Sequence, residues 1–265
     1  MPSRSASPTP LAPALVDGYL RRIGHAPVST PDLATLASLQ DAHVRAVPFE
    51  NLDIHLGRPL RLDLDHLAAK VVADRRGGFC FELNGLFCAL LLTLGFDARL
   101  VEARGTRDDG SLGTPFDHAR ILARFASTEV LVDVGTGVSP RGPIRLDDAP
   151  QRIGRCSYRV RRAGGRYVSE RWEDGAWSPG WSFDTTPRAL HDFAARCRHH
   201  ERSPESDFTG KPLCTLVTED GHLTLSDRRL ITVRGDDRVE QEVDDPLAVL
   251  DARFGVRLPR WPGSD

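Results

Sequence analysis

One cysteine stands in a setting that favours a reactive thiolate. Cys80 follows Arg75-Arg76 and the pair Gly77-Gly78, and it precedes an apolar run, residues 86–94, that predicts a helix. A helix N-terminus carries partial positive charge, and nearby guanidinium groups would add to it. The glycines would let the backbone or a substrate come close to the sulfur. Cys80 is therefore a candidate nucleophile. A buried, inert cysteine is the alternative, and Cys88, inside the apolar run, is typical of it.

A nucleophilic cysteine needs a base, and the base needs a group that orients it. Of nine histidines, His118 differs because it opens an apolar strand in the region that follows Cys80. Asp133 lies among nearly continuous apolar residues of the next strand, where an unpaired carboxylate would be costly to bury. An outward-facing aspartate at a strand end is the alternative interpretation.

The pairing of those two strands decides whether the histidine meets the aspartate. A hairpin with an even-numbered loop places His118 and Asp133 on one face, and a turn centred on Phe125-Ala126 would place them directly opposite. The sequence leaves that register open. A relay from Cys80 through His118 to Asp133 is geometrically possible.

The pattern of apolar residues divides the chain into three regions. Three- and four-residue spacing predicts helices over residues 16–23, 31–44 and 64–72, with Asp63 and either Ser29 or Thr30 as N-caps. A non-helical insert, residues 47–54, interrupts them, and the helix that follows Cys80 ends at Gly95. After Gly95 the pattern predicts strands over residues 98–103, 119–125, 130–134, 157–160 and 167–172. It then predicts a helix over 187–199, strands over 213–218, 222–225 and 229–233, and a final helix over 246–254. This order suggests three modules around one shared site.

Composition excludes several classes of function. The chain has 265 residues, 27% of them charged, and a net charge of −2, which gives no case for nucleic acid or an anionic membrane as partner. Residues 1–13 are predicted to be disordered and lack a secretory signal, and no apolar stretch is long enough to cross a bilayer. Five cysteines without C-x-x-C spacing indicate neither a disulfide framework nor a metal site. We therefore expect a reducing, cytoplasmic setting.

Three motifs resemble those of the arylamine N-acetyltransferases. They are residues 76–84 (RGGFCFELN), 47–52 (VPFENL) and 132–135 (VDVG), and the intervals from cysteine to histidine and from histidine to aspartate, 38 and 15 residues, also match. Weaker similarities occur at 203–208, 220–225 and 254–256. The resemblance covers nearly everything after Leu15.

The resemblance implies a fold and a reaction. It implies an α+β fold with a helical bundle over 14–96 that carries the nucleophile, a β-barrel over 97–186 that carries histidine and aspartate, and a linker helix and α/β lid over 187–265. Cys80 would be the nucleophile, His118 its base and Asp133 the group that orients the imidazole. Acetyl-CoA would acetylate Cys80, and an arylamine or arylhydrazine would then take the acetyl group, without a metal. The loop Gly135-Thr136-Gly137 could offer backbone N–H groups to the CoA phosphates, although Gly-x-Gly is more often simply a turn.

Two departures from the family pattern bear on the acceptor. Thr136 stands where the family usually has an aromatic residue that lines the acceptor pocket, and Asp117 stands where a hydroxyl residue is often found. Thr136 favours a roomier pocket, so an amide synthase of the same family, closing a macrolactam from a carrier-bound acyl chain, is the nearest alternative. A cysteine protease or transglutaminase-like hydrolase and a non-catalytic binding module are the other classes considered.

Overall fold

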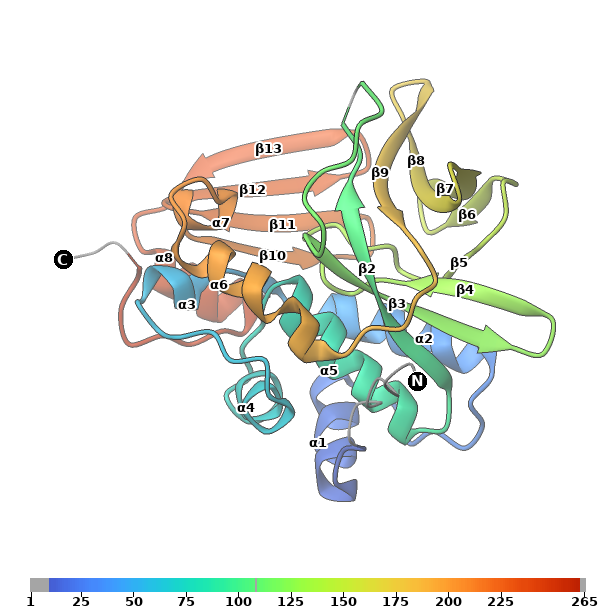
Figure 1. Cartoon of the computed structure of the whole chain (residues 1–265). Helices are drawn as coiled ribbons and strands as arrows, with labels where there is room; N and C mark the ends of the chain where they lie inside the picture. Colours follow the sequence, from blue (N-terminus) through green and yellow to red (C-terminus); the bar gives the residue numbers. More distant parts are fainter. Residues whose placement is uncertain (1–9, 108, 263–265) are drawn as a thin grey trace.

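The computed structural model describes residues 10–107 and 109–262, and it has three parts (Figure 1). The predicted disordered tail, residues 1–13, lies outside the described residues as far as Thr9, and Pro13 already begins a helix. The first part contains the helices α1 (Pro13–Ile23), α2 (Leu33–Ala46), α3 (Leu52–His55), α4 (Leu64–Ala68) with its π-helical continuation (Ala69–Ala73), and α5 (Cys80–Thr93). The side chain of Asp32, and not Ser29 or Thr30, caps α2, while Asp63 caps α4 as predicted.

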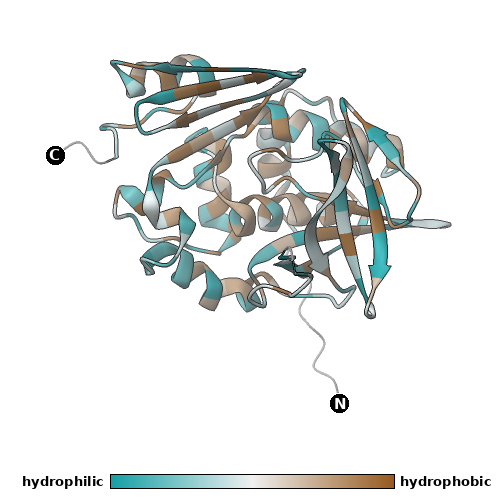
Figure 2. Cartoon of the chain, turned by 90° about the horizontal axis from the view of Figure 1, so that it is seen from above, coloured by the Kyte–Doolittle hydropathy of each residue, from teal (hydrophilic) through white to brown (hydrophobic). Residues whose placement is uncertain are grey.

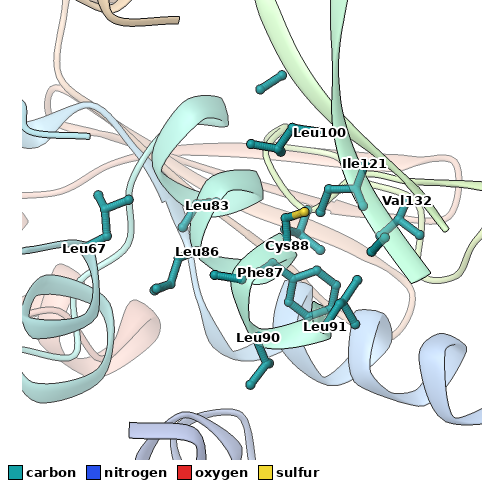
Figure 3. Packing of buried hydrophobic residues seen from close by; sticks show 14 of the residues in the cluster. Leu67, Leu83, Leu86, Phe87, Cys88, Leu90, Leu91, Leu100, Ile121 and Val132 are labelled. Atoms are coloured by element: carbon teal, nitrogen blue, oxygen red, sulfur yellow. The ribbon is translucent and has the colours of Figure 1, made fainter. Parts of the chain in front are cut away.

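Helix α5 lies at the centre of the molecule. Every residue from Cys80 to Leu91 is buried, so this helix is apolar on all sides instead of carrying one stripe. It packs against α4 and against two strands of the middle part, β2 (Asp97–Gly105) and β3 (His118–Phe125). Figure 3 shows Phe87 and Cys88 of α5 beside Ile121 and Val132 of the strands. Cys88 is completely buried, and burial raises the pKa of its thiol to about 12, as expected of an inert core cysteine.

The middle part is an eight-stranded antiparallel sheet. Its spatial order is β5-β4-β3-β2-β9-β8-β7-β6, and β5 also contacts β7, so the sheet nearly closes into the implied barrel. The strands are β2 (Asp97–Gly105), β3 (His118–Phe125), β4 (Thr128–Val132), β5 (Ile144–Arg145), β6 (Gln151–Ile153), β7 (Cys156–Ala163), β8 (Arg166–Glu173) and β9 (Ala176–Phe183).

The third part combines short helices with a second sheet. Its elements are a 3₁₀ turn (Leu190–Phe193), α6 (Ala194–Arg202), α7 (Asp207–Gly210), β10 (Leu213–Val217), β11 (Gly221–Ser226), β12 (Arg229–Arg234), β13 (Asp237–Glu242) and α8 (Pro246–Val249) with a π-helical continuation (Leu250–Phe254). Hydrophobic and hydrophilic residues lie side by side along the strands of both sheets (Figure 2). The predicted α+β class, with helices first, a β-rich middle and a mixed end, is confirmed.

The insert between α2 and α3 joins the first part to the third. Its two-residue strand β1 (Phe49–Glu50) pairs with β10, so it becomes the edge of the C-terminal sheet. Asn51 continues this junction by donating to the carbonyls of Phe208 and Lys211 and accepting from the N–H of Leu213. The division into 14–96, 97–186 and 187–265 stays a prediction, since the second sheet takes strands from two of these segments.

Candidate active site

The N-terminus of α5 presents Cys80. Phe79 precedes the helix in an extended conformation, and its N–H donates to Oε2 of Glu82 at 3.1 Å, which caps the first turn. The glycines before it serve close packing and not a left-handed backbone: a Cβ on Gly77 would lie 1.9 Å from the carbonyl oxygen of Pro48. The turn therefore fits only without side chains.

The expectation that two arginines favour the Cys80 thiolate is wrong. The guanidinium of Arg76 binds Glu50 at 2.7 Å and Asp53 at 3.0 Å, and the side chain of Arg75 is exposed. Burial raises the pKa of the Cys80 thiol well above its ordinary value, the backbone of Ala119 lowers it, and the charge of Asp133 raises it. The local setting thus does not generate a thiolate, so the proton of Cys80 needs a nearby base.

His118 and Asp133 meet across the hairpin of β3 and β4. The turn is the two-residue loop Ala126-Ser127, because Phe125 pairs with Thr128. This even-numbered loop places the two residues on one face, as expected, but diagonally and not directly opposite. Nε2 of His118 donates to Oδ2 of Asp133 at 2.7 Å. Nδ1 is then the ring nitrogen that can accept a proton.

The carboxylate of Asp133 accepts hydrogen bonds on both oxygens. Oδ2 also accepts from Nε of Arg120 at 2.9 Å, while Oδ1 accepts from Nδ2 of Asn84 and from the N–H of Gly135, each at 2.9 Å. Burial alone would raise the pKa of Asp133, but its neighbours His118 and Arg120 and the hydrogen bonds that it accepts lower it well below the ordinary value. Asp133 is therefore a buried, ionised group and not an outward-facing residue.

Asn84 links α5, the helix that begins at Cys80, to the strands. Its Nδ2 donates to the carbonyl of Ala119 at 2.7 Å as well as to Asp133, and its Oδ1 accepts from the N–H of Val134 at 3.0 Å. These contacts lead away from the first turn of α5, which Glu82 caps. Asn84 instead holds α5 in register with β3 and with the end of β4.

A cavity of about 290 Å³ opens onto Cys80 and His118. Its apolar wall includes Phe49 from β1 and Phe208 from α7, and Trp181 of β9 stacks on the His118 ring at a centroid distance of 4.5 Å. The remaining lining residues are polar, charged or glycine, namely Asp117, Gly135, Thr136, Gly137, Arg196, His200, Glu205 and Asp207. All three parts of the fold thus contribute to one cavity.

Asp117 is held by the helix that follows the barrel. Its Oδ1 accepts from Nε of Arg196 at 2.6 Å, and Nε2 of His200 lies 3.3 Å from the same oxygen. Burial raises the pKa of Asp117, but these partners lower it more, so the group is ionised. The residue that departs from the family pattern at position 117 therefore forms an ion pair on the cavity wall.

The loop Gly135-Thr136-Gly137 lines the cavity, but two of its N–H groups are already engaged. Gly135 donates to Asp133, and Thr136 donates to Oγ of Ser139 at 3.0 Å. A Cβ on Gly135 would lie 2.7 Å from Cα of Cys80, so this glycine lets the loop pass close to the backbone of Cys80. That these three residues contact CoA stays a prediction.

Three residues of the site were not singled out from the sequence. Trp181 lies in a strand in which Pro179 and Gly180 interrupt the alternation of apolar and polar residues. The aromatic residues at 177, 181 and 183 are the one sequence feature that indicates this strand. Arg120 and Arg196 carried no signal, because arginine is abundant throughout the chain.

The described residues contain no group of three or more His, Cys, Asp or Glu side chains arranged to hold a metal ion. Among the same residues, no helix has the length and apolar character needed to cross a membrane.

Comparison with known proteins gives extensive matches. A family model described as N-acetyltransferase matches residues 32–261. The arylamine N-acetyltransferase of Mycolicibacterium smegmatis is 36% identical over 258 residues, which cover 94% of both chains.

Solved structures agree with this match. The arylamine N-acetyltransferase of Salmonella typhimurium aligns with a TM-score of 0.87 at 29% identity, covering 93% of this chain and 92% of that chain. The arylamine N-acetyltransferase of Mycobacterium marinum in complex with CoA aligns with a TM-score of 0.84 at 30% identity, covering 91% of this chain and 92% of that chain. The likeness extends over nearly the whole length, as the sequence motifs indicate.

Proposed function

The chain belongs to the arylamine N-acetyltransferase family, and from this premise we propose that Cys80, His118 and Asp133 are the residues with which it transfers an acetyl group from acetyl-CoA to the nitrogen of an arylamine or arylhydrazine. The observation that carries the proposal is the 2.7 Å hydrogen bond from His118 to a buried, ionised Asp133, together with the cavity that His118 and Cys80 both line. A base oriented in this way beside a cysteine is the arrangement that nucleophilic catalysis requires.

In the first half-reaction Cys80 becomes acetylated. Nδ1 of His118 takes the thiol proton, and the sulfur attacks the thioester carbonyl of acetyl-CoA. The carbon–sulfur bond to CoA breaks, and the imidazolium returns its proton to the departing CoA thiolate. Because burial disfavours a free thiolate, sulfur and imidazole act as a pair, with Asp133 stabilising the imidazolium.

In the second half-reaction the amine takes the acetyl group. The neutral amine attacks the Cys80 thioester while Nδ1 of His118 accepts the proton that the nitrogen loses. The carbon–sulfur bond breaks, and the sulfur regains a proton from the imidazolium. Weakly basic anilines and hydrazines suit this step, since they are unprotonated at neutral pH. Phe49 and Phe208 offer aromatic surface beside the reacting sulfur.

Steady-state kinetics test this proposal. With acetyl-CoA and an arylamine, we expect parallel double-reciprocal lines and a burst of CoA equal to the enzyme concentration when the amine is left out. Cys80→Ser should abolish both while its far-UV circular dichroism stays unchanged. Intersecting lines without a burst would contradict a covalent intermediate.

Thr136 supports a second candidate of the same family. A threonine beside Gly137 and Ser139 leaves open the side of the cavity that an aromatic residue would fill, which suits a larger acyl chain. If the protein is an amide synthase, long-chain acyl-pantetheine thioesters should acylate Cys80 faster than acetyl-CoA does. The reverse preference selects the acetyltransferase.

The setting proposed for this reaction is the cytoplasm. All five cysteines are free, and four of them are buried, which is compatible with a reducing environment. Localisation of a tagged chain by cell fractionation tests this part of the proposal.

A further inference from the structure

A buried arginine binds the carboxylate that orients His118. Arg120 lies two residues after His118 on β3, and its Nε donates to Oδ2 of Asp133 at 2.9 Å, the same oxygen that accepts from His118. The Arg120 side chain is only 5% exposed, and its Nη1 donates to Oγ of Ser169 on β8 at 2.7 Å. The guanidinium also lies 5.6 Å from the ring centre of Phe183. These contacts hold the Arg120 guanidinium in one position.

A cation buried in this place changes what Asp133 can do for the imidazole. Arginine stays protonated at neutral pH, so the Arg120–Asp133 pair has no net charge. A proton added to His118 therefore joins a neutral pair, in which the carboxylate attracts it and the guanidinium repels it. With a lone aspartate, only the attraction would remain.

The two half-reactions differ in the proton that His118 must accept. In the free enzyme, the imidazole takes the proton of the Cys80 thiol. In the acetylated enzyme that thiol is blocked, and the imidazole must be unprotonated to accept the proton of the attacking amine. A group that resists protonation of His118 therefore favours the second half-reaction.

We propose that Arg120 is a positioning residue that fixes Asp133 and, through its charge, keeps His118 unprotonated as the base of amine transfer. This inference rests on the proposed acetyltransferase function. It deepens that function by assigning the balance between the two half-reactions to a residue outside the triad.

The other charged or titratable groups near His118 are the same in the wild type and in the Arg120 variants. They come from every element next to His118 except β9, whose Trp181 is uncharged. The groups are Cys80 from α5, Asp133 from the end of β4, Asp117 from the start of β3, Arg196 and His200 from α6, and Glu205 and Asp207 from the α7 region. Since only position 120 changes, a difference between variants reports on Arg120.

Amine-dependent loss of the acetyl group measures the effect. The enzyme is acetylated with acetyl-CoA, freed of CoA, and mixed over a range of pH with an arylamine that is itself unprotonated throughout. Because Cys80 is blocked, the acid limb of the rate reports protonation of the base. In Arg120→Gln, which keeps a donor but loses the charge, we expect the midpoint of this limb to move up by about one pH unit.

Matched variants separate charge from structure. Arg120→Lys keeps the charge and should keep the wild-type midpoint even if its plateau rate falls. Arg104→Gln is the control, because Arg104 pairs with Glu102 on its own strand, β2, and is not among the hydrogen-bond partners of Asp133 in the described residues. If Arg120→Gln does not fold, Ser169→Asp offers the same test by neutralising Arg120 from its other side.

The outcomes of these experiments separate a failure of the role inferred for Arg120 from a failure of the proposed acetyltransferase function. A raised midpoint in Arg120→Gln or Ser169→Asp, with Arg120→Lys and Arg104→Gln unchanged, supports the role of Arg120. Equal midpoints in all variants overturn it. If wild-type protein forms no acetyl-enzyme, the proposed function itself fails before Arg120 is tested.

Discussion

Asp133 organises the site at the scale of single residues. It accepts hydrogen bonds from the histidine, an arginine, an asparagine and a backbone N–H, and these four donors come from one strand, one helix and the loop after β4. A carboxylate can be buried at low cost only when several hydrogen-bond donors, including charged ones, bind its oxygens. The histidine is therefore oriented by a group that is itself fixed.

Thr136 lines the same cavity as Cys80 and limits the room beside it. In Thr136→Phe the ring would fill part of the 290 Å³ cavity, so acylation by long-chain thioesters should fall about tenfold, about 1.4 kcal/mol, while acetylation changes much less. Acylation rates with the two donors measure this. Thr136→Ser, which keeps the hydroxyl near Oγ of Ser139, should behave as wild type. An equal loss for both donors would show general damage to the site and contradict a size effect.

At this scale the sequence predicts the three residues with motif signals and misses those whose role depends on tertiary contact. Cys80, His118 and Asp133 were proposed from their residue types and settings together with the resemblance of the surrounding motifs to a known family. Arg120 and Trp181 could not be found in this way, since their importance comes from strand register and ring stacking. The supposed role of Arg76 beside the thiol was wrong for the same reason: proximity in sequence does not give direction in space.

At the scale of elements, a buried ionic cluster holds the start of α5. Lys70, from the π-helical turn, lies 2.8 Å from Glu82 and 2.8 Å from Asp53, and Arg76 binds Glu50 and Asp53. The cluster connects the insert, α3, α4 and α5, which fixes the turn that presents Cys80. Such a cluster tolerates the loss of one member poorly, because a buried charge is then left without its partner.

Lys70→Met tests the cluster. Removing this cation leaves three buried carboxylates with one buried arginine, so the free energy of unfolding should fall by about 3–5 kcal/mol. Urea denaturation at pH 7 measures the change. Lys211 is the other lysine of the chain and is exposed, so Lys211→Met should have almost no effect. Equal stability of the two variants would mean that the cluster is not stabilising.

Element types could be predicted from periodicity where one face of the element is buried. Strand β13 was missed because all six of its residues are exposed at the edge of the sheet, so no alternation marks them. Strand β9 was missed because it contains Pro179 and Gly180. The pairing of β1 with β10 joins residues more than 160 positions apart, and no local pattern encodes it.

At the scale of the whole molecule, the cavity exists only when all three parts are assembled. Its walls come from β1, α5, the barrel, α6 and α7, and α5 passes through the centre of the helical core. Stability of the helical core therefore supports the site directly, and a group buried far from the cavity can make the site sensitive to pH.

His43 is such a group. It is completely buried, Nδ1 lies 2.8 Å from the hydroxyl of Tyr19, and burial, with a smaller effect of Arg22, lowers its pKa from 6.5 to about 3. Between these values the unfolded chain binds a proton that the folded protein does not, so acid destabilises the fold. From pH 7 to pH 5 this residue should remove about 2 kcal/mol from the free energy of unfolding.

Urea denaturation at both pH values checks this. His43→Gln should lose that part of the pH dependence, whereas His191→Gln should retain it, because His191 is 79% exposed. The absolute stability of His43→Gln is not the test, since the contact with Tyr19 changes as well. The same pH dependence in His43→Gln as in wild type would show that His43 is not the responsible group.

The most direct test of the account is the mass of the protein after incubation with acetyl-CoA alone. We predict that intact mass spectrometry shows one adduct of about 42 Da, that peptide mapping places it on Cys80 and not on the other four cysteines, and that an arylamine removes it with formation of one equivalent of N-acetylated product. An unmodified protein, or an adduct on another residue that an amine does not remove, would contradict the account.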